Sequence, residues 1–254
     1  MKFVIKQEKF EYMLEKLLVK DMVPSSVLSV KDGKMFSIQK EEKGRSLRML
    51  KLQKEFFEEI DDKANESIQI EIAKFLKNVK LFPPKEKLVC EVKGSVMSIK
   101  GEVRNPKLTI ESPRSEVLTK LPFNIEGNVP VVKDDQGAEI KLDKKIVVDV
   151  SEFREIIRGA EAIGTEFYEF TDKDGKFLTV VGDLNSHEKD EFFPKSSLNG
   201  KDFKAVYTYG MQQIGATFDK EVNINMSGDA PAWIYETSKE HLLGVFIPPF
   251  VSED

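Results

Sequence analysis

One pattern of predicted strands and helices occurs in each half of the chain. Each half opens with a short strand, Phe3–Ile5 or Ile146–Val150, that leads directly into a helix. Each half then continues through a hairpin and further strands to a second helix and a final meander. Because each copy must bury its own apolar faces, such repetition favours two α+β units of one design. We predict two structurally duplicated domains, 1–110 and 146–254, each with two helices packed on antiparallel sheets, with residues 111–145 as the connector.

The helices are predicted from apolar residues that recur at helical spacing. The four segments are Lys9–Lys20, Glu71–Lys80, Ser151–Ile163 and about Tyr207–Phe218. Each segment has a single apolar stripe, which indicates a helix with one face on a sheet and the other face open. In the third segment Ser151 is expected to cap the helix, and Gly164 is expected to end it.

Short strands with turns account for nearly all the remaining sequence. Val27–Val30 and Met35–Gln39 flank an Asp-Gly turn, and so do Phe167–Phe170 and Lys176–Val181, which predicts two hairpins. A meander is expected after the second helix and another after the fourth. Their strands are Lys87–Val92, Val96–Lys100 and Lys107–Ile110, then Glu221–Met226, Ala232–Tyr235 and Leu242–Ile247.

Residues that commonly build catalytic and metal sites are scarce. Cys90 is the single cysteine and alternates with apolar neighbours, which favours a buried structural thiol. His187 and His241 are the only histidines, and both lie in charged, loop-like contexts. The sequence therefore predicts no enzyme, no metal site and no cofactor. An enzyme on an α+β scaffold is the alternative, with Asp172/Asp174 and His187/Glu188/Asp190 as its acidic loops, which we interpret as solvated turns.

The formal net charge of −5 limits how the chain can act on nucleic acid. Proteins that hold DNA by affinity alone usually carry a basic excess, since phosphate neutralisation supplies most of the binding. An acidic chain can still do so if its basic residues share one surface or if topology keeps it on the DNA. No apolar run approaches the roughly 20 residues that span a bilayer, so we expect a soluble, intracellular protein without a membrane partner.

The C-terminal motifs give this layout a family resemblance. They are Ser227-Gly228-Asp229-Ala230-Pro231-Ala232-Trp233-Ile234-Tyr235 and Gly244-Val245-Phe246-Ile247-Pro248-Pro249-Phe250-Val251-Ser252-Glu253-Asp254. With the strand and Phe-centred helix over Val147–Gly164, they resemble the two-domain sliding clamps of the proliferating cell nuclear antigen (PCNA) family. In that family a D-x-P turn opens the penultimate strand, and the last strand runs into an aromatic-Leu-Ala-Pro segment. Pro248 and Phe250 depart from the family pattern, where alanine and a basic residue are usual.

The resemblance implies a DNA polymerase processivity factor, a ring that encircles duplex DNA without sequence preference and tethers replication and repair proteins. Helix faces opposite the apolar stripes would then meet DNA. The basic residues expected there are Lys9, Lys16, Lys20, Lys74, Lys77, Lys80, Arg154, Arg158 and Lys220. Solvated helix faces are the alternative interpretation of these side chains.

The resemblance also implies a groove for short peptides from DNA polymerase, clamp loader, ligase and nuclease partners. The residues that match it by position are Leu47, Leu118, Leu121, Pro231, Phe246, Ile247 and Pro249. Ordinary core and strand-end positions are the alternative, which for Ile247 is as well supported as the groove.

A two-domain clamp implies a homotrimer. We expect the edge strand Lys107–Ile110 to pair with Lys176–Val181 of the next chain, through Leu108, Ile110, Phe177, Leu178 and Val180. A heterotrimer subunit or a checkpoint-type clamp is the nearer alternative. The expected location is the cytoplasm, associated with the nucleoid, for an archaeal or viral protein and the nucleus for a eukaryotic one.

Overall fold

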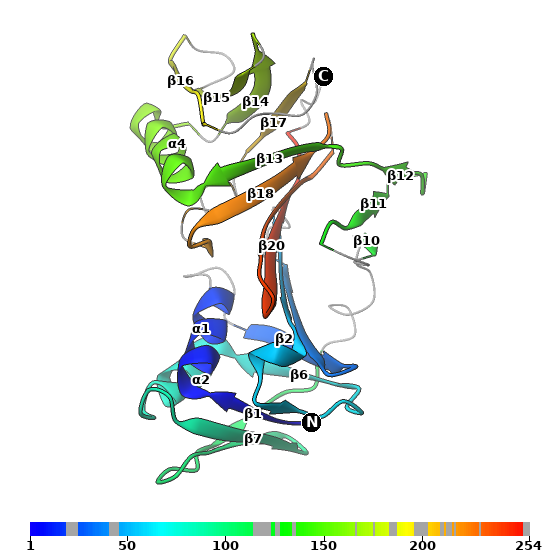
Figure 1. Ribbon diagram of the computed structural model, residues 1–254, viewed down its shortest axis with the longest axis vertical. Coiled ribbons are helices and arrows are strands. Elements are labelled where there is room, and N and C mark those ends of the chain that lie inside the picture. Colours follow the sequence, from blue (N-terminus) through cyan, green and yellow to red (C-terminus); the bar gives the residue numbers. More distant parts are fainter. Residues whose placement is uncertain are drawn as a thin grey trace. The chain divides into compact units, whose positions relative to one another are not determined.

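The computed structural model describes most of the chain. The residues described are 1–18, 25–40, 46–113, 123–124, 128–133, 136–165, 167–174, 176–182, 187–195, 203–208, 211, 215, 217–228 and 230–250. The chain divides into two compact units (Figure 1). Unit 1 holds Met1–Glu42, Arg48–Leu121 and Thr237–Leu243, and unit 2 holds Lys43–Leu47, Pro122–Glu236 and Gly244–Asp254. The domain and connector limits given above stay a prediction.

The described residues of unit 1 form two α-helices and two groups of antiparallel strands. Its elements are β1 (Lys2–Lys6), α1 (Gln7–Leu17), β2 (Ser25–Lys31), β3 (Lys34–Lys40), β4 (Leu47–Leu52), the 3-10 turn η1 (Lys54–Phe56), β5 (Glu59–Ile60), β6 (Glu66–Glu71), α2 (Ile72–Val79), β7 (Lys87–Lys93), β8 (Val96–Lys100) and β9 (Lys107–Thr109). One sheet has the order β5-β1-β7-β8-β9, and the strands β4-β3-β2-β6 form the other group.

Unit 2 repeats this arrangement. Its elements are β10 (Phe123–Asn124), β11 (Val131–Lys133), β12 (Glu139–Ile140), β13 (Lys144–Asp149), α4 (Val150–Ile163), β14 (Tyr168–Lys173), β15 (Lys176–Gly182), β16 (Lys189–Phe192), β17 (Lys204–Tyr207), β18 (Glu221–Met226), β19 (Ala232–Thr237) and β20 (His241–Ile247). The order β13-β18-β19-β20 matches β1-β7-β8-β9, and β16-β15-β14-β17 matches β4-β3-β2-β6. The predicted fold class, a duplicated α+β design with antiparallel sheets, is confirmed.

The helices are held by packing of their apolar stripes. Phe10, Met13, Leu14 and Leu17 of α1 are fully buried, and the ring of Phe10 meets that of Phe3 of β1 edge to face at 6.0 Å. Helix α2 has only eight residues, too few to persist alone in water. Its stability therefore comes from the burial of its stripe, where each large side chain contributes about 1.5–3 kcal/mol.

Three predicted helix details need correction. Asp149, rather than Ser151, caps α4, because its carboxylate accepts the backbone N–H of Ser151 at 2.7 Å. Helix α1 begins two residues earlier than predicted and ends at Leu17. The fourth helix was placed too early, since Tyr207 lies in β17, although Met211, Gly215 and Thr217 are helical. Gly164 does end α4, in the left-handed conformation that glycine adopts without strain.

One predicted trimer strand is also misplaced. β15, which carries Phe177, Leu178 and Val180, lies between β14 and β16 and is not an edge. Among the described residues the edge strands of this sheet are β16 and β17, whereas β9 is at an edge as predicted. The hydrophobicity of β15 therefore reflects an interior position: Phe177 and Leu178 are buried within the chain itself.

Candidate DNA-facing helices and partner groove

The outer faces of α1 and α2 in unit 1 carry both signs of charge. Lys80, just after α2, pairs with Glu15 at 2.8 Å and Glu11 at 3.5 Å of α1, and the hydrogen bond to Glu15 raises the pKa of Lys80. Lys9 is 2.8 Å from Glu240, and its ammonium group lies 5.2 Å from the centre of the Phe56 ring. These two lysines are therefore engaged by their own unit.

Lys74 and Lys77 are the more available cations of this helix pair. Both project from α2 opposite its buried stripe, and within the described part of the chain neither makes an ion pair. Lys16 lies with its ammonium group 5.3 Å from the centre of the Tyr12 ring, and Lys20 is outside the described residues. Contacts to phosphate from this face would thus depend mainly on two α2 side chains, the exposed Lys77 and the half-buried Lys74.

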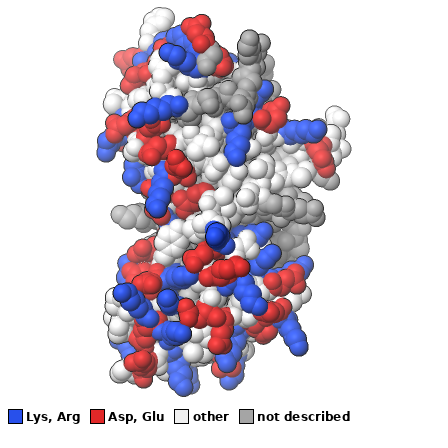
Figure 2. Space-filling model, in the orientation of Figure 1, with Lys and Arg blue, Asp and Glu red and all other residues white. Residues whose placement is uncertain are grey.

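Helix α4 of unit 2 is nearly neutral on its outer face. Arg158 pairs with Glu155 one turn away, and Arg154 donates from Nε to the carbonyl of Gly215 at 2.9 Å. Lys220 is exposed beyond the fourth helical segment. On the face seen in Figure 2, Lys and Arg side chains are interspersed with Asp and Glu. A surface of mixed charge would contact DNA phosphates only weakly and without sequence preference.

The predicted partner groove centres on an aromatic stack in unit 2. Phe246 of β20 packs against Trp233 of β19 with ring centres 4.6 Å apart, and Trp233 stacks on Tyr235 at 5.8 Å. The indole N–H of Trp233 donates to the carbonyl of Asn128 at 2.7 Å. A Cβ atom added at Gly244 would lie 1.9 Å from the indole, so Trp233 lies flat on this glycine.

Tyr207 joins two of the predicted groove segments. Its hydroxyl donates to the carbonyl of Ala230, beside Pro231, at 3.2 Å. Its backbone forms a bridge to Pro249, and the backbone N–H of Phe250 donates to Val206 at 2.8 Å. The segment after β20 therefore runs along β17, and the Phe250 ring meets Phe167 edge to face at 5.0 Å.

The remaining predicted groove residues differ in burial. Ile247 and Phe246 are both buried, on opposite faces of β20, which supports the core interpretation for both. Leu47 begins β4 and is partly exposed, and Leu118 and Leu121 lie outside the described residues. Sequence reasoning missed Trp233, Tyr207 and Asn128. Alternation from Pro231 through Trp233 to Tyr235 was the signal available for Trp233.

Little in the described residues suggests other chemistry. They contain no group of three or more His, Cys, Asp or Glu side chains that could hold a metal ion. Burial raises the pKa of the Cys90 thiol well above its usual value, which makes it unreactive at neutral pH. None of the helices seen is long and apolar enough for a membrane span.

Comparison with known proteins gives matches at the level of structure. No protein-family model matches the sequence, and no curated protein matches it. Archaeoglobus fulgidus PCNA bound to the C-terminal region of FEN-1 has a TM-score of 0.76 at 14% identity, covering 100% of this chain and 99% of that one. Entamoeba histolytica PCNA scores 0.75 at 16% identity, covering 98% of each chain. The Sulfolobus tokodaii PCNA2–PCNA3 complex scores 0.70 at 14% identity, covering 98% of this chain and 99% of that one.

These matches establish the fold. Full coverage at such scores means that both units, and not one of them, follow the PCNA design. The chain therefore has the fold of a PCNA-like sliding clamp.

Proposed function

We propose that this protein is a DNA sliding clamp and polymerase processivity factor, a non-enzymatic ring that encircles duplex DNA and tethers replication and repair proteins. The observation that carries the proposal is the PCNA fold over the whole chain. An acidic protein suits this role, because a ring is retained by topology and needs only weak phosphate contacts.

The free sheet edges support ring closure. In unit 1 the start of β20 lies beside β4 in the strand order, and Gln53 after β4 donates its N–H to Glu240 at 2.8 Å. The counterpart of β4 in unit 2 is β16, and the counterpart of β20 is β9. Both are edge strands in the described structure. A β9 strand of one copy can therefore cover β16 of the next, as the start of β20 lies beside β4 within unit 1.

Such an interface joins different surfaces of successive copies. Heterologous contacts of this kind close into rings when the rotation permits, and closure removes the exposed edges. By analogy with PCNA, three copies would form the ring. The homotrimer should have three times the chain mass, 3 × 29.0 kDa, or about 87 kDa.

The partner role has support from the same fold. The A. fulgidus PCNA structure holds the C-terminal region of FEN-1, and here the partly exposed Pro249 follows Phe246, which is buried against Trp233 in unit 2. We infer that short peptides with aromatic or aliphatic anchors bind at this end of β20. Clamp loader, polymerase, ligase and nuclease are the partners expected to carry them.

A heterotrimer subunit is the second candidate. The S. tokodaii match is a complex of two different PCNA chains, so the fold also serves clamps built from unlike subunits. In that case this chain alone would not assemble into a closed ring.

Light scattering on the purified protein, combined with one substitution, tests the proposal. The register of β8 and β9, with the bond from Ile110 N–H to Ser95, directs the N–H of Leu108 to β8 and that of Thr109 outward. Thr109→Pro should therefore remove an interchain hydrogen bond and yield monomers, while Thr109→Val keeps the N–H and the ring.

The outcome separates the candidates. A wild-type mass near 87 kDa that falls to 29.0 kDa in Thr109→Pro supports the homotrimer. A wild-type monomer that forms a ring only with another clamp chain supports the heterotrimer. A trimer that survives Thr109→Pro intact argues against β9 as the interface.

A further inference from the structure

Two large apolar side chains are more exposed than any other in the described part of the chain. Val103 is 93% exposed and Phe193 is 51% exposed. Val103 lies in the turn that joins β8 to the edge strand β9, and Phe193 directly follows the edge strand β16. A single exposed apolar side chain is common and has no special meaning. Here, however, the two lie at the ends of the strands that ring closure would pair.

The turn that carries Val103 is held firmly within unit 1. The backbone N–H of Glu102 donates to the carboxylate of Glu86 at 2.6 Å. A Cβ atom added at Gly101 would lie 2.8 Å from the ring of Phe82, so this ring packs directly against the turn. A partner that contacts Val103 therefore does not have to order the turn first.

Phe193 is displayed on the open face of its sheet. The preceding Phe192 packs on α4, where a Cβ atom added at Gly159 would lie 2.3 Å from its ring. Side chains alternate along an extended chain, so Phe193 points to the opposite face, away from the helix.

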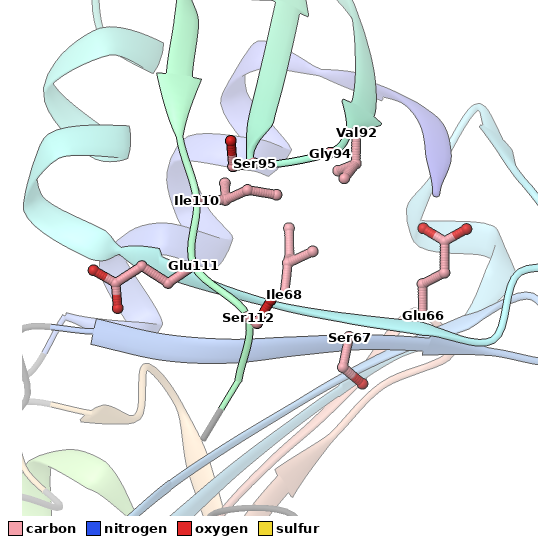
Figure 3. Close-up of a pocket in the computed structure, with 9 residues that line it drawn as sticks. All are labelled: Glu66, Ser67, Ile68, Val92, Gly94, Ser95, Ile110, Glu111 and Ser112. Atoms are coloured by element: carbon pink, nitrogen blue, oxygen red, sulfur yellow. The ribbon is translucent and has the colours of Figure 1, made fainter. Parts of the chain in front are cut away.

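The other end of β9 is engaged by its own unit. Beyond β9, Glu111 exchanges two backbone hydrogen bonds with Gln69 of β6, at 2.9 and 3.0 Å. Figure 3 shows Ile110 and Glu111 where the chain passes β6. Among the described residues the open part of this edge is therefore β9 and the turn before it, which carries Val103.

The duplication gives the equivalent of Phe193 in unit 1. Strands β3 and β15 both follow an Asp-Gly turn and have seven residues each. The connections that follow them, residues 41–46 and 183–188, are equally long. Strands β4 and β16 therefore begin at equivalent residues, Leu47 and Lys189. Four positions further on, Lys51 is the equivalent of Phe193.

The equivalent of Val103 follows from rows of directly opposed residues across the two sheets. Trp233 is placed opposite Phe246 by the bond from the Ser238 N–H to the His241 carbonyl, and their rings are 4.6 Å apart. The equivalent rows are Lys2, Glu91, Ser98 and Lys107 in unit 1 and Lys145, Asn225, Trp233 and Phe246 in unit 2. Lys107 thus matches Phe246, and four positions earlier Val103 matches Leu242.

These two equivalents lie opposite each other within unit 1. The N–H of Gln53, after the end of β4, donates to Glu240, before the start of β20, at 2.8 Å. The strands are therefore antiparallel, and this register places Lys51 opposite Leu242. Pairing of β9 with β16 in the same register would place Val103 of one copy opposite Phe193 of the next.

We propose that Phe193 packs against Val103 of the neighbouring copy, and that this contact selects a second copy of this chain as the partner of each open edge. The proposal rests on the clamp function proposed above. The chain carries both halves of the contact, one on each unit, so identical copies can join head to tail. The contact therefore favours the homotrimer over a ring of unlike subunits.

The charges at this interface explain why an apolar contact is needed. The same register sets Lys107 opposite Lys189, and like charges directly opposite each other disfavour strand pairing. Lysines on open edges also protect a sheet from pairing with unrelated strands. Burial of Val103 and Phe193 against each other offsets this repulsion only when the correct partner is in register.

Charge substitutions at the two positions test the contact. Val103→Lys and Phe193→Glu, alone and combined in one chain, are compared by light scattering over a dilution series. Each single variant should raise the concentration at which half of the trimer dissociates about tenfold or more, since the apolar contact is lost. The double variant should recover about threefold, because a lysine then faces a glutamate at every interface. Salt should reduce this recovery.

Val147→Lys is the matched control, because Val147 of β13 is also exposed, at 41%, but lies on neither β9 nor β16. It should leave the trimer unchanged. The inference is overturned if either single variant dissociates as the control does. It is also overturned if the double variant is no more stable than both single variants, because the two side chains then do not face each other. In both cases Thr109→Pro still tests the strand pairing, so the clamp proposal can stand without this contact. A wild-type chain that stays monomeric overturns the contact and the homotrimer together.

Discussion

Gly244→Ala should destabilise unit 2, because no space exists for the added methyl group. The new Cβ would lie 1.9, 2.3 and 2.6 Å from three indole carbons of Trp233, well inside contact distance. The indole cannot easily move aside. It is fully buried, stacked on Tyr235, tilted against Phe246, and hydrogen-bonded to the carbonyl of Asn128.

The expected cost follows from these contacts. Overpacking a core by one methyl group typically costs about 1–3 kcal/mol, and loss of the Asn128 hydrogen bond adds about 1 kcal/mol. The reduced freedom of alanine in the unfolded chain offsets about 0.4–1 kcal/mol. The net loss is about 1–3 kcal/mol. With a urea dependence of about 2 kcal/mol per molar, the midpoint should fall by about 0.5–1.5 M.

Intrinsic fluorescence gives a clean assay, since Trp233 is the single tryptophan and therefore reports unit 2. Gly228→Ala is the matched control, because its added Cβ meets nothing within 4 Å and should change stability by less than about 0.5 kcal/mol. Gly244→Ala should also shift the emission spectrum of the folded protein. Equal midpoints and identical spectra for the two variants would refute the packing of Trp233 on Gly244.

Three further predictions concern DNA, partners and pH. Processive synthesis at low salt should fall when Lys74, Lys77, Arg154 and Arg158 are replaced by alanine. The difference from wild type should shrink as salt rises, because salt screens contacts to phosphate. Full activity of the variant at low salt would exclude these helix faces from the DNA path. Phe246→Ala should weaken binding of a peptide from the same organism's replicative polymerase about tenfold or more and leave the oligomer intact, and unchanged affinity would misplace the groove. Because burial raises the pKa of Cys90, the contribution of the Cys90 thiol to the free energy of unfolding is full below the unfolded thiol's pKa of about 8.5 and falls as pH rises above it. The urea midpoint of Cys90→Ala should therefore fall less at alkaline pH than that of the wild type. Parallel pH profiles of the two midpoints would contradict this.

The fold was predictable where local signals agreed. The stripes in α1, α2 and α4 and the two Asp-Gly hairpins all formed close to their predicted positions, because one face of each element had to be buried. The start of the fourth helix was not predictable, because Tyr207 fits the apolar stripe of a helix and the alternation of a strand equally well. Its place in β17 is decided by pairing with Tyr168 of β14, a partner distant in sequence.

The site was predictable only in outline. A basic residue on or next to a helix looks the same in sequence whether it makes no ion pair among the described residues, as for Lys74, or pairs with a neighbouring helix, as Lys80 does with Glu15. Likewise, the sequence does not distinguish a groove residue from a core residue on one strand, and Phe246 and Ile247 of β20 are both buried. The packing role of Trp233 was not predicted, because it depends on a contact with Gly244 of β20 that leaves no local pattern in the sequence.

The misplaced trimer strand shows what duplication adds to such reasoning. The family layout was expected to place Phe177 and Leu178 on an edge strand, yet β15 is an interior strand that buries both residues, and edges are usually protected by charge. The residues Lys189, Asp190 and Glu191 of β16 fit that rule. Matching the two units strand by strand identifies β16 as the equivalent of β4, and β9 as the equivalent of β20. The repeat thus favours β16 and β9 for the proposed interface, because an edge with a counterpart that is paired in the other copy of a duplicated fold is where another chain can add its strand.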